Sequence, residues 1–225
     1  LFFAAGLMLV FAILFLPRIR ADRRVSSNMR GGGAANEKPT LLRYPAWIGG
    51  FAAYAVVAYL SSIMPLWARE DLGLNKTLIG WLLLVRTFAT SAGFFVMGRT
   101  MVWHYSSRQM IGGQLSLAGV IMVMAYVSSP LWLGATLLAA GALGAMAYFN
   151  SMFHGAAGSP DRVRSLTIHE TILNSGILTG TLGGGVMYQM LSFEYGCRIF
   201  AALILTVAVA QGVLCWRASR MEGRG

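Results

Sequence analysis

Charged side chains are scarce in this sequence. Only 12% of its 225 residues are Asp, Glu, Lys or Arg, whereas a soluble domain carries about 25%. Hydrophobic residues make up 56% of the chain, and a soluble fold would need a polar surface to cover them. The sequence does not contain enough polar residues for such a surface, which excludes an ordinary soluble domain.

Cysteine and the usual catalytic patterns are also nearly absent. Cys197 and Cys215 are the two cysteines. They lie at opposite ends of one predicted helix, roughly 27 Å apart, which excludes a disulfide between them. The sequence has no metal-ligand spacing, no HExxH motif, and no Ser–His or paired-acid arrangement. We therefore expect no metal, no cofactor and no enzymatic activity.

The sequence instead contains about seven apolar blocks, most of them long enough to cross a membrane. A helix needs roughly 20 residues to span a hydrocarbon layer of about 30 Å. The blocks are apolar on all sides, which excludes barrel strands, because these alternate polar and apolar residues. The predicted fold class is all-α, a polytopic integral membrane helical bundle. The blocks cover residues 1–16, 44–67, 77–98, 109–127, 131–153, 165–191 and 195–216.

These blocks divide the chain into four predicted segments. Residues 1–17 lack the preceding positive charge of a signal peptide, and we interpret them as a truncated transmembrane helix, so that the sequence is a fragment. Residues 18–43 form a basic linker with a run of glycine and no apolar period. Residues 44–217 form a six-helix membrane bundle, and residues 218–225 form a tail.

Basic residues are distributed unevenly between the two ends of the predicted helices. If the linker is cytoplasmic, its side of the membrane holds 14 basic residues and the opposite side holds three. Such an excess marks the cytoplasmic side, and anionic lipid head groups account for the net charge of +10. No soluble basic face for nucleic acid is present. We expect a multi-pass protein of a bacterial cytoplasmic (inner) membrane, with the linker and the C-terminus in the cytoplasm.

Arg86 is a fixed cation in the middle of a predicted span. It lies about 14 Å deep in the membrane, where a charge is costly and must face protein or water. None of the other predicted spans carries an acid at that depth. Its partner is either a carboxylate in a missing part of the protein or an anionic group of the substrate or coupling machinery.

A carboxylate lies near the start of the block over residues 165–191. Glu170 follows His169 directly and precedes Asn174 by one helical turn, about 8 Å into the predicted helix. The carboxylate either forms a salt bridge near a gate or accepts a coupling proton, because acids within membrane spans often have that role. Histidine can change its charge near neutral pH, but a single interfacial histidine is usually structural.

Glycines recur on the same predicted helix at four-residue spacing. Gly176, Gly180 and Gly184 place a stripe without side chains on one face, where another helix backbone can approach closely. The contact is either static packing or a sliding surface between helices. Both interpretations place this helix at a helix–helix interface, away from lipid.

Aromatic and amide side chains complete the candidate lining of a cavity. Tyr54 lies in the block over residues 44–67, and Tyr148 and Asn150 lie in the block over residues 131–153. A buried tyrosine with an internal hydrogen-bond partner is an equally ordinary interpretation of Tyr54.

The chain resembles the C-terminal half of a major facilitator superfamily transporter, in which a cytoplasmic linker precedes six helices. The loop GRTMVWHYSSR is similar to that family's loop signature, Gly-x-x-x-Asp-Arg/Lys-x-Gly-x-Arg/Lys-Arg/Lys. Gly98 and Arg108 match the signature, whereas Val102 replaces its acid and Tyr105 replaces its second glycine. The stretch RSLTIHETILNSGILTGTLGGG, residues 164–185, resembles the family's eleventh helix.

The resemblance implies that the first block is helix six and that the others are helices seven to twelve. It implies alternating access, in which two six-helix halves rock around a central site. The resemblance further implies that Tyr54, Tyr148 and Asn150 face the cavity. It implies that Arg86 lies on the flank of this cavity and that Glu170 lies near the cytoplasmic gate. The implied partners are a small-molecule substrate, the lipid bilayer and the missing N-terminal half of the same protein.

The predicted function is therefore secondary active transport of a small solute, coupled to an ion, with the proton as the first candidate. The alternative is a non-transporting membrane scaffold or an inactive remnant of a transporter. An upstream set of about five further spans with an intact loop signature would favour the transporter.

Overall fold

The computed structural model describes residue 40 and residues 42–101 and 103–222, with side chains up to residue 217. These residues belong to one unit, which begins at Thr40. The expected helix over residues 1–17 lies outside the described residues, as do most of the expected linker and the side chains of the tail.

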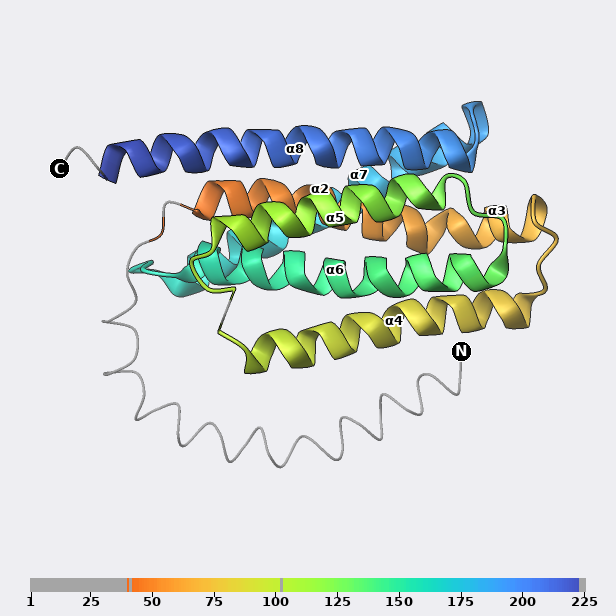
Figure 1. The fold of residues 1–225 in the computed structure, drawn as a ribbon, viewed down its shortest axis with the longest axis horizontal. Helices are drawn as coiled ribbons and strands as arrows, with labels where there is room; N and C mark the ends of the chain where they lie inside the picture. The colour runs from red at the N-terminus through yellow and green to blue at the C-terminus, as the bar shows by residue number, and fades with distance from the viewer. Residues whose placement is uncertain (1–39, 41, 102, 223–225) are drawn as a thin grey trace. The chain divides into compact units, whose positions relative to one another are not determined.

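Helices account for nearly all of the described residues, which contain no strand. Side-chain caps begin three of the helices, because Asn75, Ser106 and Asp161 each accept a hydrogen bond from a backbone N–H of the first turn. The helices are α2 (Arg43–Ser62), α3 (Met64–Glu70), α4 (Lys76–Arg99), α5 (Ser107–Met124), α6 (Pro130–Ala156), α7 (Arg162–Met190) and α8 (Phe193–Glu222), shown in Figure 1.

Four spans among the described residues are long and apolar enough to cross a membrane: α2 with α3, α4, α6, and Phe193–Arg217 of α8. The short α3 continues α2 after a break at Ile63, where Pro65 in the first turn cannot donate a backbone hydrogen bond. Helices α5 and α7 also coincide with predicted spans, but they are less apolar than the other four. The six long helices and their order agree with the predicted all-α membrane bundle.

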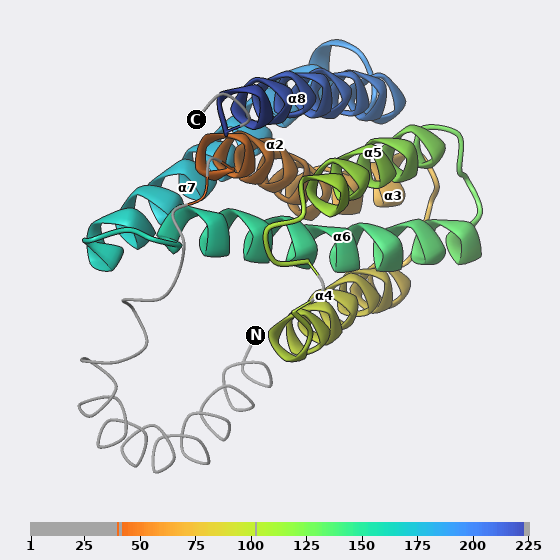
Figure 2. The ribbon, with the colours of Figure 1, turned by 60° about the vertical axis from the view of Figure 1, so that its left-hand side comes forward.

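Successive long helices alternate in direction, so the bundle has two ends (Figure 1). We call the end at which α2 begins the entry end; the loops that precede α5 and α7 lie there. Helix α2 packs mainly on α7, and α6 packs mainly on α4, while α2 and α6 also contact each other. Helices α5 and α8 pack on each other; α5 also packs on α6, and α8 also packs on α2, as Figure 2 shows.

This arrangement divides the bundle into two units of three helices, α2–α4–α5 and α6–α7–α8. The first helix of each unit packs on the second helix of the other unit, and the two third helices pack together. Because α2 and α6 run in opposite directions, the two units are related as inverted repeats are. Neither unit makes its main helix contact within itself.

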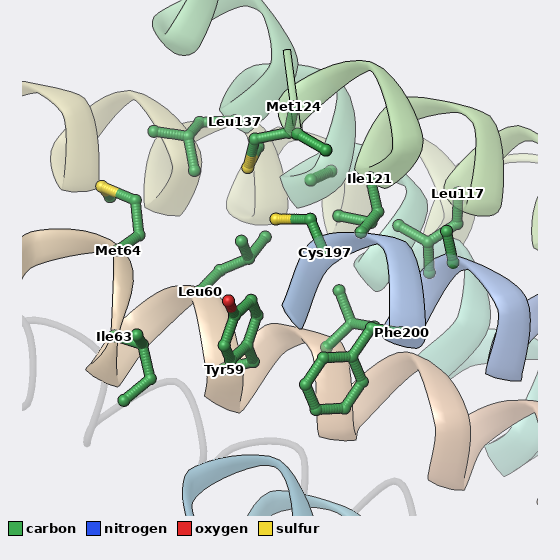
Figure 3. Close-up of a cluster of buried hydrophobic side chains, with 14 of the residues drawn as sticks. Tyr59, Leu60, Ile63, Met64, Leu117, Ile121, Met124, Leu137, Cys197 and Phe200 are labelled. Atoms are coloured by element: carbon green, nitrogen blue, oxygen red, sulfur yellow. The ribbon is translucent and has the colours of Figure 1, made fainter. Parts of the chain in front are cut away.

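Aromatic and aliphatic side chains of α2, α5 and α8, joined by others from α3, α4 and α6, form the core of the bundle. The hydroxyl of Tyr59 donates to the carbonyl oxygen of Phe193 at 2.8 Å, and its ring centroid lies 4.7 Å from that of Phe200. Figure 3 shows Tyr59 and Leu60 of α2 beside Phe200 of α8 and Ile121 of α5. These side chains are buried, so packing and the buried hydrogen bond of Tyr59 help to fix α8 against α2.

A glycine stripe brings the backbone of α7 against α2. A Cβ atom added at Gly180 would overlap the carbonyl oxygen of Ala55, and one at Gly176 would lie 2.5 Å from the carbonyl oxygen of Phe51. Gly184 leaves room for the ring of Tyr59. The structure therefore places the predicted stripe at a helix–helix interface, where any side chain would separate the two helices.

The second central pair, α4 with α6, is built in the same way. A Cβ at Gly141 would overlap the backbone oxygen of Arg86, and one at Gly93 would lie 2.8 Å from the Cβ of Ala145. The hydroxyl of Thr90 lies 3.0 Å from the backbone oxygen of Arg86 and 3.1 Å from that of Gly141. Close backbone contact thus fixes both pairs of helices on which the bundle depends.

We expect Gly180→Ala to destabilise the bundle by about 1–3 kcal/mol, because the new methyl group must push α7 away from Ala55. Gly183→Ala is the matched control: its Cβ would meet no atom within 4 Å, and alanine favours helix more than glycine does. Thermal unfolding of the purified protein in detergent should show a lower midpoint for Gly180→Ala alone. Equal midpoints for the two variants would contradict the close contact.

Candidate substrate and coupling site

A tyrosine of α6 connects side chains from three other helices. The Tyr148 hydroxyl donates to Oε1 of Glu170 on α7 at 3.0 Å. Its ring centroid lies 5.9 Å from that of Tyr54 on α2 and 5.3 Å from that of Phe94 on α4. We call Tyr54, Phe94, Tyr148 and Glu170 the tyrosine–glutamate cluster. None of its members comes from α5 or α8.

His169 holds the start of α7 against α6 beside this cluster. Its side chain is fully buried, and its Nδ1 lies 2.9 Å from the hydroxyl oxygen of Ser151. Its Nε2 lies 3.7 Å from Oε1 of Glu170, and its ring packs edge-on against Tyr148 at 5.1 Å. The His169 ring therefore lies beside the Glu170 carboxylate on the side that faces the interior of the bundle.

The Glu170 side chain is hydrogen-bonded through one carboxylate oxygen and is also exposed to solvent. Its side chain is 53% exposed, so the carboxylate is open to solvent while Oε1 accepts from Tyr148. Asn174, one turn further along α7, donates to the backbone oxygen of Glu170 at 2.8 Å. Tyr148 and His169 are its side-chain neighbours, and no Lys or Arg of the described side chains forms a salt bridge with it. The arrangement can hold and exchange a proton at a carboxylate on an aromatic surface.

Arg86 lies farther from the entry end than the cluster does. Its Nη1 donates to the backbone oxygen of Val57 at 3.2 Å, whereas its Nε is buried without a hydrogen-bond partner. Val57 packs near Gly144, which precedes Tyr148 by about one turn of α6. No carboxylate among the described side chains forms a salt bridge with Arg86. The guanidinium is thus held by the α2 backbone, about one helical turn from the cluster, with its Nε unpaired.

Asn150 is not part of this cluster. It is 3% exposed and lines a small cavity together with Gln114 of α5 and Gln211 of α8. Asn150 follows Tyr148 by two residues, which turns it about 200° around α6. The expected grouping of Tyr54, Tyr148 and Asn150 on one cavity wall is therefore not formed in the structure; only the two tyrosines meet.

Sequence reasoning also missed Phe94 and Ser151. Both are ordinary residues of apolar helices, and nothing in their local pattern indicates a site. Only the spacing of Ser151 gives a signal, since it lies about one turn beyond Tyr148 on α6. In the structure these two side chains contact His169 and Glu170, neighbouring residues of α7.

The loop that resembles the family signature is held by aromatic packing. Trp103 is buried, and its Nε1 donates to the backbone oxygen of Met97 at 3.0 Å. The ring of His104 stacks on Phe153 at 4.1 Å. Gly98 and Arg108, the two matches to the signature, are both exposed at the ends of this loop.

Tyr105, at the position of the signature glycine, has a left-handed backbone conformation with φ of 56°. Glycine adopts this region without a steric penalty, but a residue with a Cβ does not. The ring of Tyr105 packs against Phe153 at 5.2 Å. At the position of the signature glycine, the loop therefore has a backbone turn that glycine would favour, although the residue there is a tyrosine.

Comparison with known proteins yields one match. The family model described as Major Facilitator Superfamily matches residues 46–223, which include all of the side chains described above. No curated protein and no solved structure matches the chain. Among the described residues, no group of three His, Cys, Asp or Glu side chains is placed to hold a metal ion.

A pair of substitutions at Tyr105 tests the strained turn. Tyr105→Gly and Tyr105→Ala both remove the ring contact, but only glycine also removes the penalty of the left-handed backbone. We expect the glycine variant to be more stable than the alanine variant by about 1 kcal/mol, measured by chemical unfolding in detergent. The same pair at Ser116, an exposed position within α5, should give the opposite order. The same order at both positions would contradict the assigned turn.

Proposed function

Because the chain belongs to the major facilitator superfamily, a family of membrane transporters, we propose that it acts in secondary active transport of a small solute. The transport cycle is alternating access, and the coupling ion is the proton. The observation that supports this best is the Glu170 carboxylate, half-exposed and hydrogen-bonded to Tyr148 on an aromatic surface.

The described bundle is the C-terminal half of this transporter. Residues 44–217 supply its six helices, and residues 18–43 connect them to the preceding half. The entry end faces the cytoplasm of a bacterial cell, because the loops and termini predicted there carry most of the basic residues. The tyrosine–glutamate cluster then faces the other half, since no helix of the described bundle covers it.

Glu170 is the proton acceptor in this proposal. Its exposure gives it access to water, and Tyr148 donates a hydrogen bond that stabilises the charged carboxylate. Protonation removes that charge from the aromatic surface, which lowers the cost of closing the two halves over it. A sodium ion would need several oxygen ligands at this point, and the cluster offers only one carboxylate and the tyrosine hydroxyls.

The solute binds along the rings of Tyr54, Phe94 and Tyr148, with Arg86 as the group that recognises a negative charge. The Arg86 side chain is partly exposed, and a guanidinium presents its donors in a fixed plane. No acid among the described side chains competes for Arg86. A carboxylate or phosphate of the solute therefore suits this position, while the rings provide apolar and stacking contacts.

Transport by the full-length protein in liposomes tests the coupling. A screen of labelled solutes across imposed pH and sodium gradients should find uptake that the pH gradient drives. We expect Glu170→Gln to reduce this accumulation at least tenfold and to retain solute exchange without a gradient, because the variant binds solute but carries no proton. Glu70→Gln, an exposed carboxylate at the other end of the bundle, is the matched control.

If Glu170→Gln accumulates solute as well as the unmodified protein does, the proton has another acceptor. If no gradient drives any solute, the non-transporting scaffold or the inactive remnant becomes the better description of the protein.

Arg86 is tested by comparing two substitutions for solute recognition. Arg86→Lys keeps the charge and Arg86→Gln removes it, so the KM for an anionic solute should rise roughly tenfold more for the glutamine variant. Solute-induced thermal stabilisation should fall in the same order. Arg99→Gln, which removes a guanidinium lying over Phe95, is the control. Reduced stability without a change in KM would identify Arg86 as part of a structural ion pair instead.

A further inference from the structure

Three amide side chains are buried together away from the tyrosine–glutamate cluster. Gln114 of α5, Asn150 of α6 and Gln211 of α8 are 4%, 3% and 0% exposed. They line one small cavity, and the other lining residues are glycine or apolar, such as Ala46 and Leu117. None of the residues that line this cavity is charged. Uncharged polar groups are therefore concentrated at a point where four helices meet.

Gly49 of α2 leaves space for the side-chain amides of Gln114 and Gln211. A Cβ at Gly49 would overlap Nε2 of Gln211 and would lie 2.5 Å from Nε2 of Gln114. The same Nε2 of Gln211 donates to the backbone oxygen of Pro45 at 2.8 Å. This hydrogen bond turns the nitrogen of Gln211 toward α2 and its oxygen away from α2.

The amide oxygens have no donors. Oε1 of Gln114, Oδ1 of Asn150 and Oε1 of Gln211 are all buried without a hydrogen-bond partner. A buried acceptor without a donor is costly, and within a membrane no lipid chain can supply one. The cavity leaves about 10 Å³ for the centre of a water molecule, which is close to the least space that one water needs.

We infer that this cavity binds a single water molecule. The water donates to two of the three amide oxygens and accepts from an amide N–H, a combination that matches the donors and acceptors of amides. A cation is disfavoured, because it would give up its hydration among side chains that carry no counter-charge. The bound water joins α5, α6 and α8 beside the start of α2 and holds these helices together as one body.

A high-resolution structure of the full-length protein tests the site directly. We expect one density peak at roughly 2.7–3.1 Å from polar atoms of at least two of the three amides. Amides that hydrogen-bond to one another, with no peak between them, would overturn the inference.

Unfolding of the full-length protein in detergent tests whether the residues share one ligand. Gln114→Met and Gln211→Met keep the length of the side chain and remove its amide, so each should lower the unfolding midpoint by a few degrees. The double variant should lose less than the sum, because the two residues share one water. Gln189→Met on α7, at an exposed position, should change little. Fully additive losses would contradict a shared molecule.

The same measurement separates water from a cation. Replacing choline chloride with sodium chloride at equal ionic strength should leave the unfolding midpoint unchanged. A rise with sodium that Gln114→Met abolishes would replace the water with a cation site. The structure and the unfolding midpoints are measured without transport, so they test the water site independently of the proposed function.

Discussion

The backbone contact between α7 and α2 sets the geometry on which the rest of the bundle depends. Gly176 and Gly180 continue the stripe of α7 on which His169 is also buried. Contact along this stripe therefore places His169 beside Ser151 of α6. The next residue, Glu170, is turned by about 100° and reaches Tyr148. The position of the exposed Glu170 carboxylate thus depends on Gly176 and Gly180, two residues without side chains that lie about two and three turns farther along α7.

Helix α6 separates two polar environments of different character. On one side Tyr148 joins an exposed carboxylate to aromatic rings, where solvent has access. On the other side Asn150 meets two buried glutamines, where no lining group is charged. The first environment is the one to which we assign the proposed exchange of protons and solute, and the second suits permanent cohesion. A single helix can serve both because residues two apart point in nearly opposite directions.

The sequence predicted the helices, their order and the family, because long apolar blocks and their boundaries are local properties of the chain. It also named Tyr54 and Tyr148 as cavity candidates and Glu170 and His169 as gate or coupling candidates, and the structure places these four side chains together. It did not predict the partners of Asn150, because a single helix does not reveal which neighbour each of its faces meets. Phe94 and Ser151 were missed for the same reason. The positive φ of Tyr105 was hidden because a tyrosine gives no local sign of such a turn.

The main helix contacts form between the two three-helix units and not within them, which has a consequence for biosynthesis. The hydroxyl of Tyr59 and its acceptor at Phe193 are separated by 134 residues. The contacts of α2 with the glycines of α7 cannot form until α7 has been synthesised. During synthesis α2 therefore enters the membrane long before the surfaces that match it exist. Contacts of such long range close slowly, so the early helices must remain loosely associated in the lipid or be held by the insertion machinery. The last two helices then complete the bundle, and a chain that stops before α7 would leave α2 without its main partner and α5 without α8.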